Sequence, residues 1–80
     1  MSVVANNIVK ELPNKYSNLV DKFKCVKKEI WDKDSYCYFI EPTNWKHKEC
    51  INFNHSEYGW IVIDILENDV IGGVEFVDRL

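Results

Sequence analysis

The chain has 80 residues with 10 Lys and Arg, 13 Asp and Glu, and a formal net charge of −3. This length makes one small domain over residues 1–80 and excludes a large multi-substrate enzyme. The basic residues are spread among acidic ones and form no stripe that follows a phosphate backbone, so we expect no nucleic-acid partner.

The opening segment MSVVANNIVKELPNK lacks the basic start and unbroken apolar run of a secretory signal. No other segment approaches the ~20 apolar residues of a membrane helix. The three cysteines, Cys25, Cys37 and Cys50, are an odd number, which suits free thiols in a reducing compartment. We therefore expect a cytoplasmic protein with no membrane contact, whose cysteines are small buried residues.

Residues 1–23 are predicted to be helical, because apolar residues recur at steps of three and four. Pro13 lacks the amide that a helix interior needs, so it predicts a break or the start of a second helix. The stripe that would face a sheet contains Val4, Ile8, Leu12, Tyr16, Leu19, Val20 and Phe23.

Residues 24–80 change to a period of two, which is typical of strands. A hairpin is predicted where the turn-prone DKDS lies between KCVKKEIW and YCYFIE. Three further strands are predicted after it, namely KECINF, WIVIDI and IGGVEFV. The predicted fold is α+β: an N-terminal helix or helix pair packed on a four- to five-stranded antiparallel β-meander.

The last hairpin has two unlike faces if its turn lies within Glu67–Asp69. One face is apolar and carries Ile61, Ile63, Ile65, Val70, Gly72, Val74 and Phe76. The other, called the mixed face here, carries Trp60, Val62, Asp64, Ile71, Gly73, Glu75 and Val77. Burying an unpaired charge is costly, so Asp64 and Glu75 predict that the mixed face is exposed to water or that its carboxylates are paired. A bulge at Gly72–Gly73 would exchange the faces of the residues beyond it.

The segments VKKEIWDKDSYCYFI and GWIVIDILENDVIGGVEFVD resemble the small bacterial proteins grouped as domain of unknown function 2283. The resemblance covers about residues 24–80 and implies a small β-meander without an assigned activity. The positions that match the family pattern are Asp32, Asp64, Gly73, Glu75 and Asp78.

A tetrahedral zinc site could in principle be built from His47, Cys50 and His55, with Cys25 or Cys37 as the fourth ligand. The sequence has no Cys-x-x-Cys pair, so we expect no metal and no cofactor, with both histidines in loops or on the surface.

Catalysis would use Asp64 and Glu75 as an acid and base pair. The sequence offers neither a nucleophile elbow nor a phosphate loop, so we expect no enzyme.

Aromatic residues make up 14% of the chain, which is more than one small sheet can bury behind one helix. A candidate interaction surface therefore consists of Trp31, Trp45, Tyr58, Trp60, Asp64 and Glu75. We expect a protein-interaction module that self-associates, as a homodimer, through one sheet face. The alternative is an inhibitor-, immunity- or antitoxin-like protein that masks a basic site on a partner protein.

Overall fold

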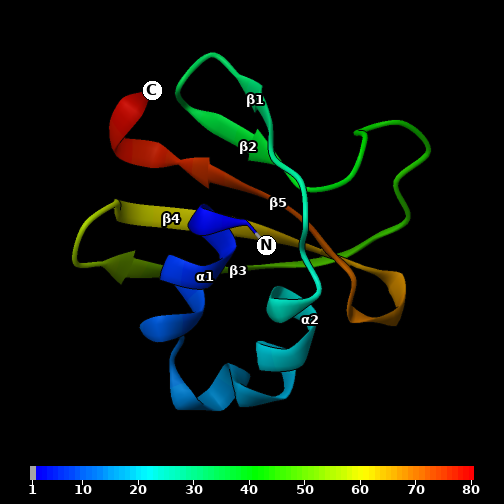
Figure 1. Cartoon of the computed structure of the whole chain (residues 1–80), viewed down its shortest axis with the longest axis horizontal. Coiled ribbons are helices and arrows are strands. Elements are labelled where there is room, and N and C mark those ends of the chain that lie inside the picture. The colour runs from blue at the N-terminus through cyan, green and yellow to red at the C-terminus, as the bar shows by residue number, and fades with distance from the viewer. Residues whose placement is uncertain (1) are drawn as a thin grey trace.

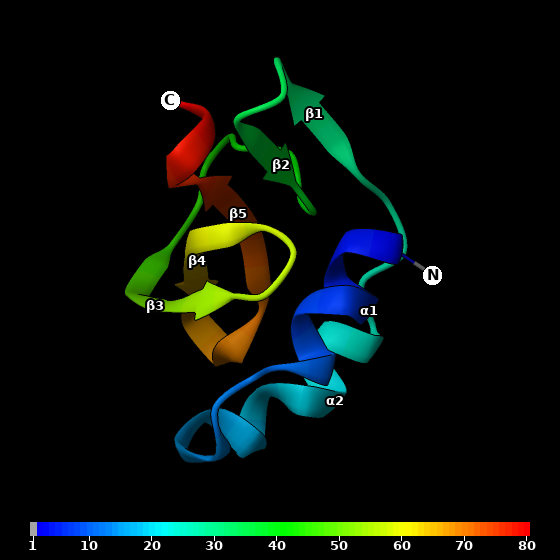
Figure 2. The same ribbon diagram turned by 90° about the vertical axis from the view of Figure 1, so that its left-hand side faces the viewer.

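The computed structural model describes residues 2–80 and has two layers, one of helices and one of sheet. The helices lie against one face of a five-stranded antiparallel sheet, as Figures 1 and 2 show. The expected α+β fold, with N-terminal helices on a meander-like antiparallel sheet, is confirmed. Within residues 2–80, no helix combines the length and the apolar character that a membrane crossing requires.

The helical layer consists of α1 (Val3–Lys10), the 3-10 helix η1 (Asn14–Leu19) and α2 (Val20–Lys24). Pro13 stands just before η1, so the helical segment breaks where the sequence predicted. The predicted stripe packs against the sheet, and its buried members are Val4, Ile8, Leu19 and Phe23.

The sheet contains β1 (Ile30–Asp32), β2 (Tyr36–Tyr38), β3 (His47–His55), β4 (Gly59–Leu66) and β5 (Ile71–Phe76). Their spatial order is β1-β2-β5-β4-β3, and all neighbours are antiparallel. Strands β3, β4 and β5 form a continuous meander, whereas the β1–β2 hairpin adds to the free edge of β5 (Figure 1). The connection between β2 and β3 therefore carries the chain from one side of the sheet to the opposite edge.

The β4–β5 hairpin turns through the short 3-10 helix η2 (Glu67–Asp69), at the place that the sequence predicted. Asn68 and Asp69 adopt positive φ angles of 63° and 59° there, which Asn and Asp tolerate better than most residues.

A β-bulge interrupts the regular alternation of β5. Asp64 pairs with Gly73 and the next residue, Ile65, pairs with Ile71, so Gly72 is the extra residue. Ile71 was expected on the mixed face, but the bulge turns its side chain to the apolar face, where it is 2% exposed.

The core lies between the helices and the apolar face of the sheet. Ile61, Ile63, Val74 and Phe76 are fully buried there, and Leu19 and Phe23 pack into the same cluster from the helical layer. Burial of this cluster is the main favourable contribution to folding in a domain of this size. The opposite face of the sheet remains available for contacts.

Candidate functional site

The mixed face is the side of the sheet that none of the helices within residues 2–80 covers (Figure 2). Residues from three strands lie together on this face because the strands pair directly. They are Trp60, Val62 and Asp64 of β4, Gly73 and Glu75 of β5, and Tyr36 and Tyr38 of β2. Strand β3 adds the polar edge of this face with Cys50, Asn52 and Asn54.

Aromatic rings form one side of the mixed face. Tyr36 and Tyr38 stack with their ring centroids 4.4 Å apart, and the ring of Trp45 meets Tyr38 edge-on at 5.7 Å. Gly73 makes this possible, because a Cβ at that position would lie 3.0 Å from the Tyr36 ring and 2.8 Å from the Cys37 carbonyl oxygen. The two tyrosines were absent from the predicted surface, although the alternation of YCYFI places them on one face.

Trp60 and Trp31 were predicted to share a surface, but they lie on opposite faces of the sheet. Trp60 lies on the mixed face and is 43% exposed. Trp31 is 42% exposed, but it pairs with the buried Cys37 and stacks on Phe76, with a centroid distance of 5.5 Å. Trp31 therefore belongs to the edge of the core, and Trp60 is the exposed tryptophan of the mixed face.

Tyr58 also lies on the helical side of the sheet. Its ring meets Phe76 edge-on at 5.2 Å and stacks on His55 at 4.7 Å, and its hydroxyl accepts a hydrogen bond of 2.9 Å from Asn7. His55 was expected in a loop or on the surface, but it is 3% exposed. Its Nδ1 accepts hydrogen bonds from two backbone amides, so Nε2 carries the proton and donates it to the Asn7 carbonyl oxygen. Both residues therefore hold α1 against the sheet.

The two carboxylates of the mixed face are half-buried and lie on neighbouring strands. Burial raises the pKa of Asp64 above its usual value, and the negative charge of Glu75 raises it further. Among residues 2–80, neither carboxylate forms an ion pair with a lysine or arginine. This face therefore presents negative charge beside exposed aromatic surface.

Asp64 also contacts two residues at the edge of the mixed face. Its Oδ1 lies 3.2 Å from His47 Nε2 and 3.3 Å from Cys50 Sγ, and those two atoms are 3.3 Å apart. These are three residue types that bind metal ions, and their ligand atoms all lie within 4.8 Å of one another. His47 and Cys50 were considered together as ligands from the sequence, but Asp64 was not grouped with them.

Of the zinc ligands considered from the sequence, His47 and Cys50 meet, whereas His55, Cys25 and Cys37 lie elsewhere. His55 is buried under α1, Cys37 is buried in the core, and Cys25 is exposed at the end of α2. Burial raises the pKa of Cys37 to about 12, and the charge of Glu29 contributes to the rise. The expectation that all three cysteines are buried is wrong for Cys25 and Cys50, which are both exposed.

The remaining family-pattern positions lie outside the mixed-face cluster. Asp78 accepts a hydrogen bond of 3.2 Å from the Trp60 amide and closes the start of β4, which is a structural role. Asp32 is exposed at the end of β1.

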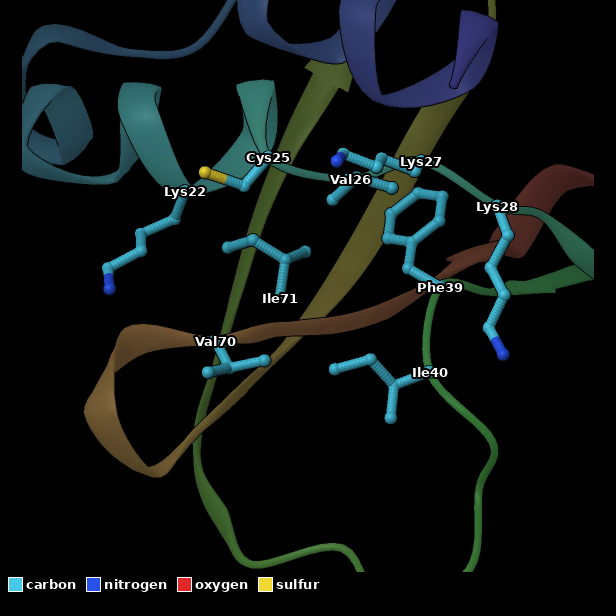
Figure 3. A pocket seen from close by; sticks show the side chains of 9 residues that line it. All are labelled: Lys22, Cys25, Val26, Lys27, Lys28, Phe39, Ile40, Val70 and Ile71. Atoms are coloured by element: carbon cyan, nitrogen blue, oxygen red, sulfur yellow. The ribbon is translucent and has the colours of Figure 1, made fainter. Parts of the chain in front are cut away.

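A second surface feature is a pocket of about 400 Å³ between the end of α2, the end of β2 and the start of β5 (Figure 3). Phe39, Ile40, Val70 and Ile71 line it with apolar surface. Lysine side chains stand around these apolar groups, and the described residues provide no ion-pair partner for Lys22, Lys27 or Lys28. The pocket therefore has the opposite charge to the mixed face.

Comparison with known family models, with curated proteins and with solved structures found no match to this chain.

Proposed function

We propose that this chain is a non-enzymatic protein-interaction module that binds a basic partner protein through its mixed face. The observation that carries the proposal is the exposed Trp60 side chain on an uncovered sheet face, beside the carboxylates of Asp64 and Glu75. Tryptophan is the side chain that most often anchors protein interfaces, because it buries a large rigid surface.

The charge of the mixed face determines the chemistry of the partner. Within residues 2–80 neither Asp64 nor Glu75 pairs with a lysine or arginine, so both carboxylates can pair with Lys or Arg of another chain. Tyr36 and Tyr38 offer aromatic surface to an arginine side chain. A partner segment that combines basic and apolar side chains can pair with the carboxylates and pack against the aromatic rings. This favours the inhibitor-, immunity- or antitoxin-like alternative over a symmetric homodimer, in which the acidic pairs of two copies would face each other.

A binding role also fits the position of the carboxylates better than catalysis does. Asp64 and Glu75 lie on an open sheet face, and the pocket of Figure 3 is lined by neither of them. An acid and base pair works best where a concave site excludes water and fixes the substrate.

The test is capture of partners from the cells that produce the protein, with tagged wild type, Trp60→Ala and Trp31→Ala. The two tryptophans are matched in exposure, at 43% and 42%, and differ in the face that they occupy. We expect a basic protein that is retained by wild type and Trp31→Ala and lost by Trp60→Ala, after both variants are shown to unfold cooperatively.

The purified partner then allows quantitative measurement. Trp60→Ala should weaken binding by at least about 1–2 kcal/mol, and Glu75→Gln should change mainly the salt dependence. A partner that binds Trp60→Ala as tightly as wild type, or the absence of any captured partner, would contradict the proposal.

Self-association is the second candidate, and the basic pocket is the observation that favours it. The lysines around the pocket are complementary in charge to the mixed face, so two copies can associate head to tail. Sedimentation of wild type, Trp60→Ala and Lys28→Ala over a range of protein and salt concentrations tests this. Oligomers that weaken in both variants support self-association, and a wild type that stays monomeric excludes it.

A further inference from the structure

We propose that His47, Cys50 and Asp64 form a binding site for one divalent transition-metal ion of borderline softness, with Zn²⁺ as the representative ion. The site lies at the edge of the mixed face and joins β3 to β4. It shares Asp64 with the proposed protein interface, but titration of the purified protein with a metal ion needs no partner protein, so the two proposals are tested separately.

The spacing of the three donor atoms fits a single ion. Zn–N and Zn–O bonds of about 2.0–2.1 Å and a Zn–S bond of about 2.3 Å at tetrahedral angles place the donors about 3.3–3.6 Å apart. The observed separations are 3.2 Å from His47 Nε2 to Asp64 Oδ1, 3.3 Å from Nε2 to Cys50 Sγ, and 3.3 Å from Sγ to Oδ1. An ion can therefore enter with adjustments of a few tenths of an ångström.

The same triangle does not suit a catalytic relay of cysteine, histidine and aspartate. Such a relay uses both ring nitrogens, one toward the nucleophile and one toward the carboxylate. Here His47 Nε2 is the atom near both Cys50 Sγ and Asp64 Oδ1. Three donors that converge on one point are the arrangement that a cation requires.

A local irregularity of β3 brings two of the donors to one face. Residues three apart on a regular strand point to opposite faces of a sheet. The register of β3 shifts between His47 and Glu49, so His47 and Cys50 lie on the same side as Asp64, which pairs directly with Cys50. Bulges commonly redirect a side chain in this way next to functional sites.

The donor chemistry selects the class of ion. Imidazole and thiolate favour Zn²⁺ and related transition metals over Mg²⁺ and Ca²⁺, which prefer oxygen ligands. Binding converts the Cys50 thiol to a thiolate and releases one proton to solvent, and the two negative ligands then balance the charge of the ion. The side chain of His47 is 45% exposed and that of Asp64 is 17% exposed, so the ion is reached from solvent and a water completes its coordination.

The test is titration of the reduced protein with Co²⁺ alone, followed by displacement with Zn²⁺. We expect saturation at one equivalent, with the sulfur-to-cobalt charge-transfer absorption of a thiolate ligand. Cys50→Ser should abolish that absorption, and His47→Ala and Asp64→Asn should each weaken binding by at least about tenfold. Cys25→Ser is the matched control, because it removes the other exposed cysteine and should leave the titration unchanged.

Thiol protection gives a second, independent measurement. In Cys25→Ser, Cys50 should react with a thiol reagent in the free protein and should be protected by one equivalent of Zn²⁺. Absence of Co²⁺ absorption in the wild type would overturn the proposal. Retention of full affinity in either Cys50→Ser or Asp64→Asn, with the variant folded, would also overturn it.

Discussion

Replacement of Glu29 by Ala should detach the N-terminus of α1 from the segment that leads into β1. The Glu29 carboxylate accepts hydrogen bonds of 2.6 Å from the Ser2 hydroxyl and 3.0 Å from the Val4 amide. It also accepts a longer one of 3.3 Å from the indole of Trp31. Ser2 is 2% exposed and caps α1 by accepting from the Ala5 amide, so loss of Glu29 leaves a buried hydroxyl proton without its acceptor.

The expected cost follows from these contacts. A hydrogen bond to a charged acceptor contributes about 1.5–3 kcal/mol when buried, and the partly exposed position of Glu29 lets water replace part of it. We therefore expect Glu29→Ala to lower the free energy of unfolding by about 2–3 kcal/mol. The measurement is urea denaturation followed by circular dichroism.

Glu41→Ala is the matched control, because this exposed loop glutamate should change stability by less than about 0.5 kcal/mol. A double-mutant cycle with Ser2→Ala isolates the contact between the two side chains and should give a coupling of about 1 kcal/mol. A loss in Glu29→Ala no larger than in the control would refute the reasoning.

The remaining predictions concern pH, the helix stripe and the buried thiol. Burial raises the pKa of Glu29, but the hydrogen bonds from Ser2, Val4 and Trp31 outweigh it, and the folded pKa is lower than normal. The ionised Glu29 carboxylate stabilises the fold above the unfolded-state pKa of about 4.3, and this stabilisation is lost as the pH falls through the folded-state pKa. The difference in unfolding free energy between wild type and Glu29→Gln should therefore shrink in acid, and a difference that stays constant with pH contradicts this. Leu19→Ala should cost about 2–5 kcal/mol in denaturant titrations and the exposed Lys22→Ala almost nothing, and equal effects would mean that the stripe is misplaced. Cys37, with a pKa raised to about 12, should resist a thiol reagent that modifies both exposed cysteines at pH 8, and equally fast reaction of all three thiols would show that the core opens readily.

The sequence by itself determined the type and order of the elements. The stripe from Val4 to Phe23 repeats with the period of a helix, and WIVIDI alternates with the period of a strand, because each element must bury one side. The break at Pro13 and the turn at Glu67–Asp69 follow from local backbone chemistry. These features depend on neighbouring residues alone, and the structure confirms them.

The tertiary structure decided which strands pair and which side chains meet. The pairing of β2 with β5 joins segments more than thirty residues apart and depends on packing over the helices rather than on a local pattern. The two bulges, at Gly72 and between His47 and Glu49, exchange the faces that simple alternation assigns. That is why Ile71 was misplaced and why the meeting of His47 and Cys50 with Asp64 could not be predicted from the sequence. Trp31 and Trp60 were wrongly grouped for another reason, because the face that Trp31 occupies depends on the pairing of β1 with β2 and of β2 with β5.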